Sequence, residues 1–211
     1  MKIEKFDYNS LDELRSNTFI LYSEKEAIVI DPSDTGESVI NFLNKRNLTL
    51  LAILLTHGHF DHIRGVNRLL KDFDVPVYIH NEDEQMLKNP YINCSFDANV
   101  EVNKKPTLIN DGDVLSFPFC EIKVIHTPFH TRGSVCYYLK DNNVLFSGDT
   151  LFKMSVGRDD LPNSIPNKRS ESLKRIKSLP GVTKIYPGHG SNSTIEFELN
   201  FNAFLKNNNL V

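Results

Sequence analysis

Residues 56–62 read THGHFDH, so three imidazoles and a carboxylate lie within six residues. The stretch follows an apolar segment, residues 50–55, with the composition of a buried strand. Because a strand delivers its last residues at a fixed position and direction, the loop after it can aim several side chains at one point. Three imidazole nitrogens and a carboxylate oxygen suit zinc, iron or manganese better than magnesium or calcium. The stretch therefore predicts a transition-metal site, and its spacing argues against a polar loop whose histidines only face water.

Further donors follow other predicted strands. Each group consists of a short strand, a turn with Gly or Pro, and then His or Asp. Strand ends that meet at one edge of an α/β sheet gather a site there, so the groups are expected to converge. The groups are His126 and His130 after residues 122–125, Asp149 after residues 144–146, and His189 after residues 184–186.

Composition and charge narrow the class of protein. The 211 residues suit one domain, predicted to span residues 1–211, with a core large enough to need no disulfide. With 24 basic and 27 acidic residues the net charge is −3, and no basic run supports nucleic-acid binding. The charged start of the chain and the lack of a long apolar run predict no export signal and no membrane partner. Three widely spaced cysteines fit reduced thiols, so we expect a cytoplasmic protein.

Periodicity predicts alternating strands and helices. A hairpin is expected at residues 18–23 and 26–31, and the segment between residues 88 and 103 is expected to be a loop or lid. The other predicted strands cover residues 50–55, 77–79, 114–117, 119–125, 135–139, 144–146 and 184–186, with β-structure also around Leu108. The predicted helices cover residues 37–46, 62–73, 82–87, 168–178 and 194–207.

The motifs resemble those of the metallo-β-lactamase superfamily. Its pattern of HxHxDH, then His, Asp and His, is matched in order across residues 56–190. The segments TPFHTRGS, FSGDTLF, VGRDDLP and YPGHG are similar to the hydroxyacylglutathione hydrolase, or glyoxalase II, branch. The resemblance implies a four-layer αββα sandwich with two divalent transition-metal ions at one edge of the paired sheets. Zinc is the first expectation for these ions, with iron or manganese as alternatives.

The resemblance also implies a ligand set. Site one would be His57, His59 and His130, and site two would be Asp61, His62 and His189. Asp149 would bridge both ions. The family's third-motif ligand is the His followed by Thr and, two residues further on, Gly, so His130 is predicted to be the ligand and His126 a supporting or structural residue.

A binuclear site with open coordination positions favours hydrolysis. A hydroxide bridging two ions is available near neutral pH, and Asp61 is predicted both to bind an ion and to orient this nucleophile. No spare acid that would protonate an amine is evident, whereas a thiolate needs little protonation to leave. The leaving-group chemistry therefore favours a thioester, and the resemblance to the glyoxalase II branch implies a small-molecule 2-hydroxyacyl thioester as the substrate. The native metal, the acyl group, the thiol carrier and the oligomeric state stay open.

Several positions depart from the glyoxalase II pattern. Phe129 stands where many relatives have a small residue, and Asp160 and Ser191 stand where those enzymes place aromatic contacts to glutathione. Arg158 is predicted to bind a substrate carboxylate, with an ion pair to a neighbouring Asp as the alternative.

Other functions are weighed against the hydrolase. The absence of an export signal and the presence of Asp149 count against a β-lactamase of this superfamily. The main rival is a mononuclear-iron persulfide dioxygenase, which would use residues matching His57, His130 and Asp149. A non-catalytic metal-binding module is the third possibility, and it gives no reason for open coordination positions.

Overall fold

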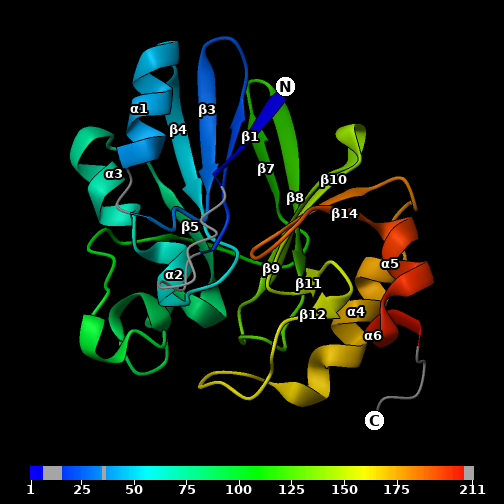
Figure 1. Ribbon diagram of the computed structural model, residues 1–211. Helices are drawn as coiled ribbons and strands as arrows, with labels where there is room; N and C mark the ends of the chain where they lie inside the picture. Colours follow the sequence, from blue (N-terminus) through cyan, green and yellow to red (C-terminus); the bar gives the residue numbers. More distant parts are fainter. Residues whose placement is uncertain (7–15, 35–36, 207–211) are drawn as a thin grey trace.

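Two sheets lie face to face in the computed structural model, which describes residues 1–6, 16–34 and 37–206 (Figure 1). The first sheet has the order β1 (Lys2–Phe6), β2 (Thr18–Tyr22), β3 (Glu26–Ile30), β4 (Thr49–Leu54), β5 (Val77–His80) and β6 (Thr107–Ile109). The second has the order β14 (Ser193–Thr194), β13 (Lys184–Pro187), β10 (Val144–Gly148), β9 (Val135–Leu139), β8 (Cys120–His126) and β7 (Val114–Phe117).

Helices cover the outer faces of the two sheets. α1 (Glu37–Arg46) and α3 (Val66–Asp72) lie beside the first sheet, and α4 (Arg169–Lys177), α5 (Ile195–Phe201) and α6 (Ala203–Lys206) lie beside the second (Figure 1). The αββα sandwich predicted from the sequence is confirmed. None of the helices within the described residues is long and apolar enough to cross a membrane.

Alternating side chains divide the core into three apolar layers, as the two-residue period of a strand requires. In β2, Ile20 packs toward the helices of the first half while Phe19 and Leu21 pack between the sheets. In β9, Tyr137 packs between the sheets while Tyr138 packs toward the helices of the second half. Both strands are therefore buried on both faces, which explains why they read as continuous apolar runs.

Parallel pairing brings the loops that carry the donors to one edge. β3, β4 and β5 run parallel to one another, and β10 runs parallel to β13. The loops after β4, β10 and β13 therefore leave the sheets in a common direction within each half. The Tyr137 hydroxyl donates a hydrogen bond of 2.8 Å to the Leu55 carbonyl, which links the two sheets just before the first of these loops.

Two predicted helices are interrupted. The helix expected at residues 62–73 forms α2 (Phe60–Ile63) and α3, which are separated at Gly65. A Cβ atom at Gly65 would lie 2.6 Å from the Asp34 carbonyl oxygen, so this glycine allows the loop after β3 to approach. The helix expected at residues 194–207 divides at Asn202, whose buried amide donates to the Glu198 carboxylate and the Ser155 carbonyl. Its last position, Asn207, lies outside the described residues.

Three further details differ from the sequence-based expectations. The helix expected at residues 82–87 is a 3₁₀ helix, Asn81–Lys88. The segment between residues 88 and 103 is mostly loop, as expected, but it contains a short 3₁₀ turn, Phe96–Ala98, and its Val100 and Val102 pack on the core of the first half. Strand β1 was not expected, because it is only partly buried and has no clear apolar alternation.

Candidate metal centre

The first group of donors joins the two halves of the chain. His57 and His59 follow β4, whereas His130 follows β8. The ligand atoms of these three histidines lie within 4.8 Å of one another, and we call them the first triad. His59 Nδ1 and His130 Nε2 approach to 2.9 Å, and all three side chains are buried.

The second group also draws on both halves. Asp61 and His62 lie in α2, and His189 follows β13. His189 Nε2 lies 3.2 Å from Asp61 Oδ2, and His62 Nε2 lies 3.6 Å from the same oxygen. We call these residues the second triad. The side chain of His189 is 34% exposed, so the group opens to solvent on that side.

Asp149 lies between the two triads. Its Oδ2 is 3.4 Å from His130 Nε2 and 3.5 Å from His189 Nε2, and its Oδ1 is 3.4 Å from His62 Nε2. The carboxylate therefore faces donors of both triads, as the bridging role predicted from the family resemblance requires. The structure brings together all seven residues predicted as ligands.

The donor atoms are arranged to bind a cation. Within the described part of the chain, the buried atoms His57 Nε2, His62 Nε2 and Asp149 Oδ1 have no hydrogen-bond partner. They belong to one group whose ligand atoms lie within 4.8 Å of one another. Buried polar atoms are rarely left unsatisfied without a ligand or a function. The His and Asp composition fits divalent transition metals such as zinc or iron. The residues present therefore fit a metal centre.

Hydrogen bonds on the far side of the imidazoles fix which nitrogen faces the centre. His130 Nδ1 donates to the Arg158 carbonyl at 2.7 Å, and His62 Nδ1 donates to Asp31 Oδ2 at 2.9 Å. The Thr56 hydroxyl gives its proton to Asp31 at 2.6 Å and so accepts from His57 Nδ1 at 3.1 Å. In all three histidines the lone pair is therefore on Nε2; it is unpartnered among the described residues in His57 and His62, and it faces His59 Nδ1 in His130.

Asp31 is a functional residue that our sequence reasoning missed. Its buried carboxylate accepts from the Thr56 backbone and hydroxyl and from His62, so it supports the first loop and the second triad together. It has a positive φ of 49°, an uncommon conformation for a residue other than glycine. A carboxylate directly after the buried strand β3 was the available signal.

The electrostatics differ between the two triads. Burial lowers the pKa of His59 to about 3 and lowers that of His57 well below its usual range, with neighbouring histidines adding to both effects. These imidazoles are neutral, which is the form that binds a metal. Burial opposes a charge on His189, but Asp149 and Asp61 outweigh it and raise the His189 pKa to about 10.

Gly188 makes room for the bridging carboxylate. A Cβ atom at this position would lie 2.2 Å from Asp149 Oδ1 and 2.8 Å from His62 Cε1. We expect Gly188→Ala to displace Asp149 and to destabilise the fold by about 1–3 kcal/mol through overpacking. Chemical unfolding and metal titration check this expectation. Gly190→Ala is a control for local crowding, because a Cβ atom there meets nothing within 4 Å, although its positive φ adds strain. A Gly188→Ala variant with unchanged metal content would contradict the close approach.

His126 lies outside both triads, as predicted. Its ring stacks on His80 with centroids 3.9 Å apart and an interplanar angle of 15°, and its Nε2 donates to the Arg132 carbonyl. Glu82 lies near this pair. Because the lone pairs of stacked rings run parallel instead of converging, the group is a poor ion site, and His126 has a structural role.

A cavity of about 520 Å³ adjoins the metal centre. The donors on its floor are His59, Asp61, His130, Asp149 and His189, and its walls are formed by Phe60, Cys94, Phe96, Phe152, Arg158 and Leu161. The walls are therefore mainly apolar. Cys94 and Phe96 belong to the segment whose role the sequence left open, and no spacing signal connected them with the donors. Phe129 is fully buried in the core behind the second sheet instead of forming a pocket wall.

Arg158 lines the cavity and also forms an ion pair. Its Nε and NH2 donate to the two carboxylate oxygens of Asp160 at 2.7 and 2.9 Å. Asp159 pairs instead with Arg169 at 2.7 Å. The ion pair with a neighbouring Asp is therefore present, and binding of a substrate carboxylate by Arg158 stays a prediction.

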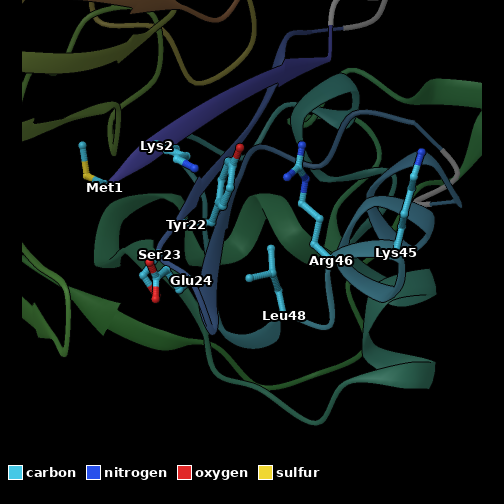
Figure 2. A pocket seen from close by; sticks show the side chains of 8 residues that line it. All are labelled: Met1, Lys2, Tyr22, Ser23, Glu24, Lys45, Arg46 and Leu48. Carbon is cyan, nitrogen blue, oxygen red and sulfur yellow. The ribbon is translucent and has the colours of Figure 1, made fainter.

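A second cavity, of about 590 Å³, lies away from the metal centre. Figure 2 shows its lining side chains, which come from the start of β1, the β2–β3 turn and the end of α1. These segments precede β3 and β4, whereas the metal centre follows them, so the cavity is at the opposite end of the first sheet. Arg46 stacks there over the rings of Tyr22 and Phe42. We assign no reaction to this cavity.

Comparison with known proteins places the chain in a family. A family model described as the Metallo-beta-lactamase superfamily matches residues 11–189, which include all seven donors. The chain belongs to this superfamily. The resemblance to the metallo-β-lactamase superfamily that the motifs indicated is thereby confirmed. Membership of its glyoxalase II branch is a narrower assignment and belongs to the proposed function.

Relatives in the superfamily include named hydrolases. A probable metallo-hydrolase, YqgX, of Bacillus subtilis is 34% identical over 197 residues, which cover 91% of this chain and 93% of the relative. A hydroxyacylglutathione hydrolase of Francisella philomiragia is also 34% identical, over 94% of this chain and 72% of that enzyme.

Several solved structures superpose on most of the chain. The BLEG-1 B3 metallo-beta-lactamase superposes with a TM-score of 0.91 at 35% identity, covering 98% of this chain and 100% of that one. TTHA1623, solved in a di-iron-bound form, has a TM-score of 0.82 at 35% identity, covering 95% and 100%. ETHE1 from Myxococcus xanthus has a TM-score of 0.76 at 26% identity, covering 96% and 84%.

Proposed function

We propose that this protein is a binuclear metal-dependent thioester hydrolase similar to the hydroxyacylglutathione hydrolases. The observation that carries the proposal is the position of Asp149, whose carboxylate lies within 3.5 Å of donors from both triads. The hydroxyacylglutathione hydrolase among the relatives and the di-iron form among the solved structures support it. Zinc is the first candidate for the native metal, with iron or manganese as alternatives.

The residues of this centre would have separate roles in holding the ions and in orienting water. His57, His59 and His130 would hold one ion, Asp61, His62 and His189 the other, and Asp149 both. Bound divalent ions supply two effects, a lowered pKa for water and polarisation of a carbonyl oxygen. Burial acts to raise the pKa of Asp61, but His62 and His189 outweigh it and lower the pKa. Because Asp61 stays ionised and lines the cavity, it can accept a hydrogen bond from a water molecule and orient it.

The cavity suits a small thioester. Phe60, Phe96 and Phe152 offer apolar contacts beside the donors, which suits a thioester sulfur and the carbon chains on either side of it. A thiolate leaving group needs little protonation, and among the described residues that form the cavity wall we identify no general acid that would serve an amine. We therefore propose a 2-hydroxyacyl thioester of a small thiol as the substrate. All three cysteines are free, which fits the cytoplasm as the proposed location.

A mononuclear-iron persulfide dioxygenase is the alternative. It would use His57, His130 and Asp149, and His130 and Asp149 do lie 3.4 Å apart. This arrangement leaves the second triad without a role, although its three ligand atoms also lie within 4.8 Å of one another. The geometry therefore favours two ions over one.

Metal content and three assays on one preparation test the proposal. Elemental analysis of protein purified without chelator should find about two transition-metal ions per chain. We expect hydrolysis of S-lactoylglutathione, no oxygen uptake with glutathione persulfide, and little cleavage of a β-lactam. One ion per chain with oxygen uptake would establish the dioxygenase instead. Fast β-lactam cleavage would instead indicate a β-lactamase, the activity that is named for the BLEG-1 structure.

Arg158 and Asp160 provide a matched pair of variants for substrate binding. If Arg158 binds a substrate carboxylate, Arg158→Ala should raise KM for S-lactoylglutathione severalfold and leave kcat nearly unchanged. Asp160→Ala should lower KM, because the guanidinium would no longer be paired. Steady-state kinetics checks both. If neither KM changes, Arg158 is only part of a loop ion pair, which is worth about 0–1 kcal/mol on a surface.

A further inference from the structure

A second buried carboxylate lies behind the first triad. Asp83, in the 3₁₀ helix Asn81–Lys88, is fully buried. Its Oδ2 accepts from the Gly58 backbone at 3.2 Å and from the Thr131 hydroxyl at 2.6 Å. Its Oδ1 accepts from the Gly133 backbone at 2.7 Å and from the Asn163 amide at 3.0 Å. One carboxylate thus binds four donors from three separate segments of the chain.

Two of those segments carry the first triad. Gly58 stands between His57 and His59, and Thr131 directly follows His130. The two loops come from different sheets, and Asp83 accepts hydrogen bonds from both. Among the described contacts of Asp83, none is a hydrogen bond or ion pair to a member of the second triad. Any effect of its carboxylate on geometry should therefore fall on the first triad.

Close packing leaves the carboxylate little freedom to move. A Cβ atom at Gly133 would lie 2.7 Å from the Cβ, Cγ and backbone nitrogen of Asp83, so only glycine allows this approach. The four donors to Asp83 are neutral groups, which makes the site costly for a buried charge unless every hydrogen bond is kept. The four donors must therefore keep their positions around Asp83, because each lost donor leaves part of the carboxylate charge uncompensated.

We propose that Asp83 is a positioning residue that sets the separation of the His57–His59 loop from the His130 loop and so determines the affinity of the first metal position. The inference rests on the proposed binuclear centre. Asp83 does not touch the donors themselves, and it acts through the backbone of Gly58 and Gly133 and the hydroxyl of Thr131.

Stepwise titration with Co²⁺ against a chelator, followed by visible absorption, tests the proposal. Asp83→Asn keeps the shape of the side chain but turns a donating amide toward groups that also donate. We expect one of the two Co²⁺ dissociation constants to rise about 10- to 100-fold, as for other residues that orient ligands. The other constant should change less than about threefold, and the absorption of the weakened ion should shift.

Two single variants, each combined with Asp83→Asn, show which of the two metal positions is weakened. In His189→Ala the second triad is broken and the remaining ion reports on the first triad, so adding Asp83→Asn should weaken its binding. In His59→Ala the remaining ion reports on the second triad, so adding Asp83→Asn should change nothing. Thr131→Val removes a single donor to Asp83 with little change in shape, and should cause a smaller loss of the same sign even where Asp83→Asn lowers the yield of folded protein.

Leu43→Ala is the control for general destabilisation. Leu43 is fully buried in α1, in the apolar layer of the first half, and touches neither triad. Its truncation should lower stability while both Co²⁺ constants stay within about threefold of the original. Equal weakening of both ions by Asp83→Asn, or no weakening in the His189→Ala background, would overturn the inference. Failure of the unaltered protein to bind two ions would overturn the binuclear centre instead.

Discussion

Asp149→Ala should abolish most of the activity and remove metal from both triads. The carboxylate approaches His130, His62 and His189 within 3.5 Å, so its removal leaves both positions without a shared anionic ligand. We expect transition-state stabilisation to fall by about 3–5 kcal/mol, or roughly 10²- to 10⁴-fold in kcat/KM. Elemental analysis and steady-state kinetics on the same preparation provide the measurement.

Asp141→Ala is the matched control for this experiment. Asp141 is an exposed carboxylate in the turn Lys140–Asn142, before the start of β10, whereas Asp149 follows the end of that strand. Its removal should leave metal content and kinetics unchanged. Near-normal metal content in Asp149→Ala would exclude this residue from the centre and with it the binuclear proposal.

Asp31→Asn should cause the second large effect, this time on both stability and metal binding. The buried carboxylate accepts three hydrogen bonds, two from Thr56 and one from His62. Asparagine tolerates the left-handed backbone but presents an amide donor to groups that donate, so unfolding free energy should fall by about 2–4 kcal/mol. His62 also loses the partner that fixes its tautomer, so metal affinity should fall about 10- to 100-fold.

Chemical unfolding and metal titration measure these two effects separately. The control is Asp113→Asn, an exposed turn carboxylate that accepts from the Asn110 backbone at 2.8 Å. It should change stability by no more than about 0.5 kcal/mol. If Asp31→Asn kept full affinity for both ions, the orientation of His62 would have to come from its packing and not from this hydrogen bond.

The members of the two triads and Asp149 were predictable from the sequence because their signal is local. His57, His59, Asp61 and His62 stand in one short stretch, and each later donor follows a strand and a turn. The order of the motifs along the chain then indicated the fold, because the family pattern fixes both together. That the donors lie close together could be predicted without knowing any contact between them.

The residues that hold the donors in place were not predictable, because their contacts are distant in sequence. Asp31 supports a loop 25 residues away, and Asp83 contacts Thr131, 48 residues away. Asp83 has no spacing or composition that separates it from an ordinary helix carboxylate, and the signal at Asp31 is only its place directly after a buried strand. The helix break at Gly65 has the same cause, since the periodicity of residues 62–73 does not show that the loop after β3 approaches there.

The composition of the two triads has a consequence for the lifetime of the protein in a cell. Each triad combines residues that follow strands of the first half with a histidine that follows a strand of the second half. An ion held by either triad is thus a reversible cross-link, and it stabilises the closed arrangement in proportion to free metal concentration. We expect metal-loaded chains to resist proteases, while chains made during metal scarcity are degraded sooner. Cellular abundance would then follow metal supply without any change in synthesis.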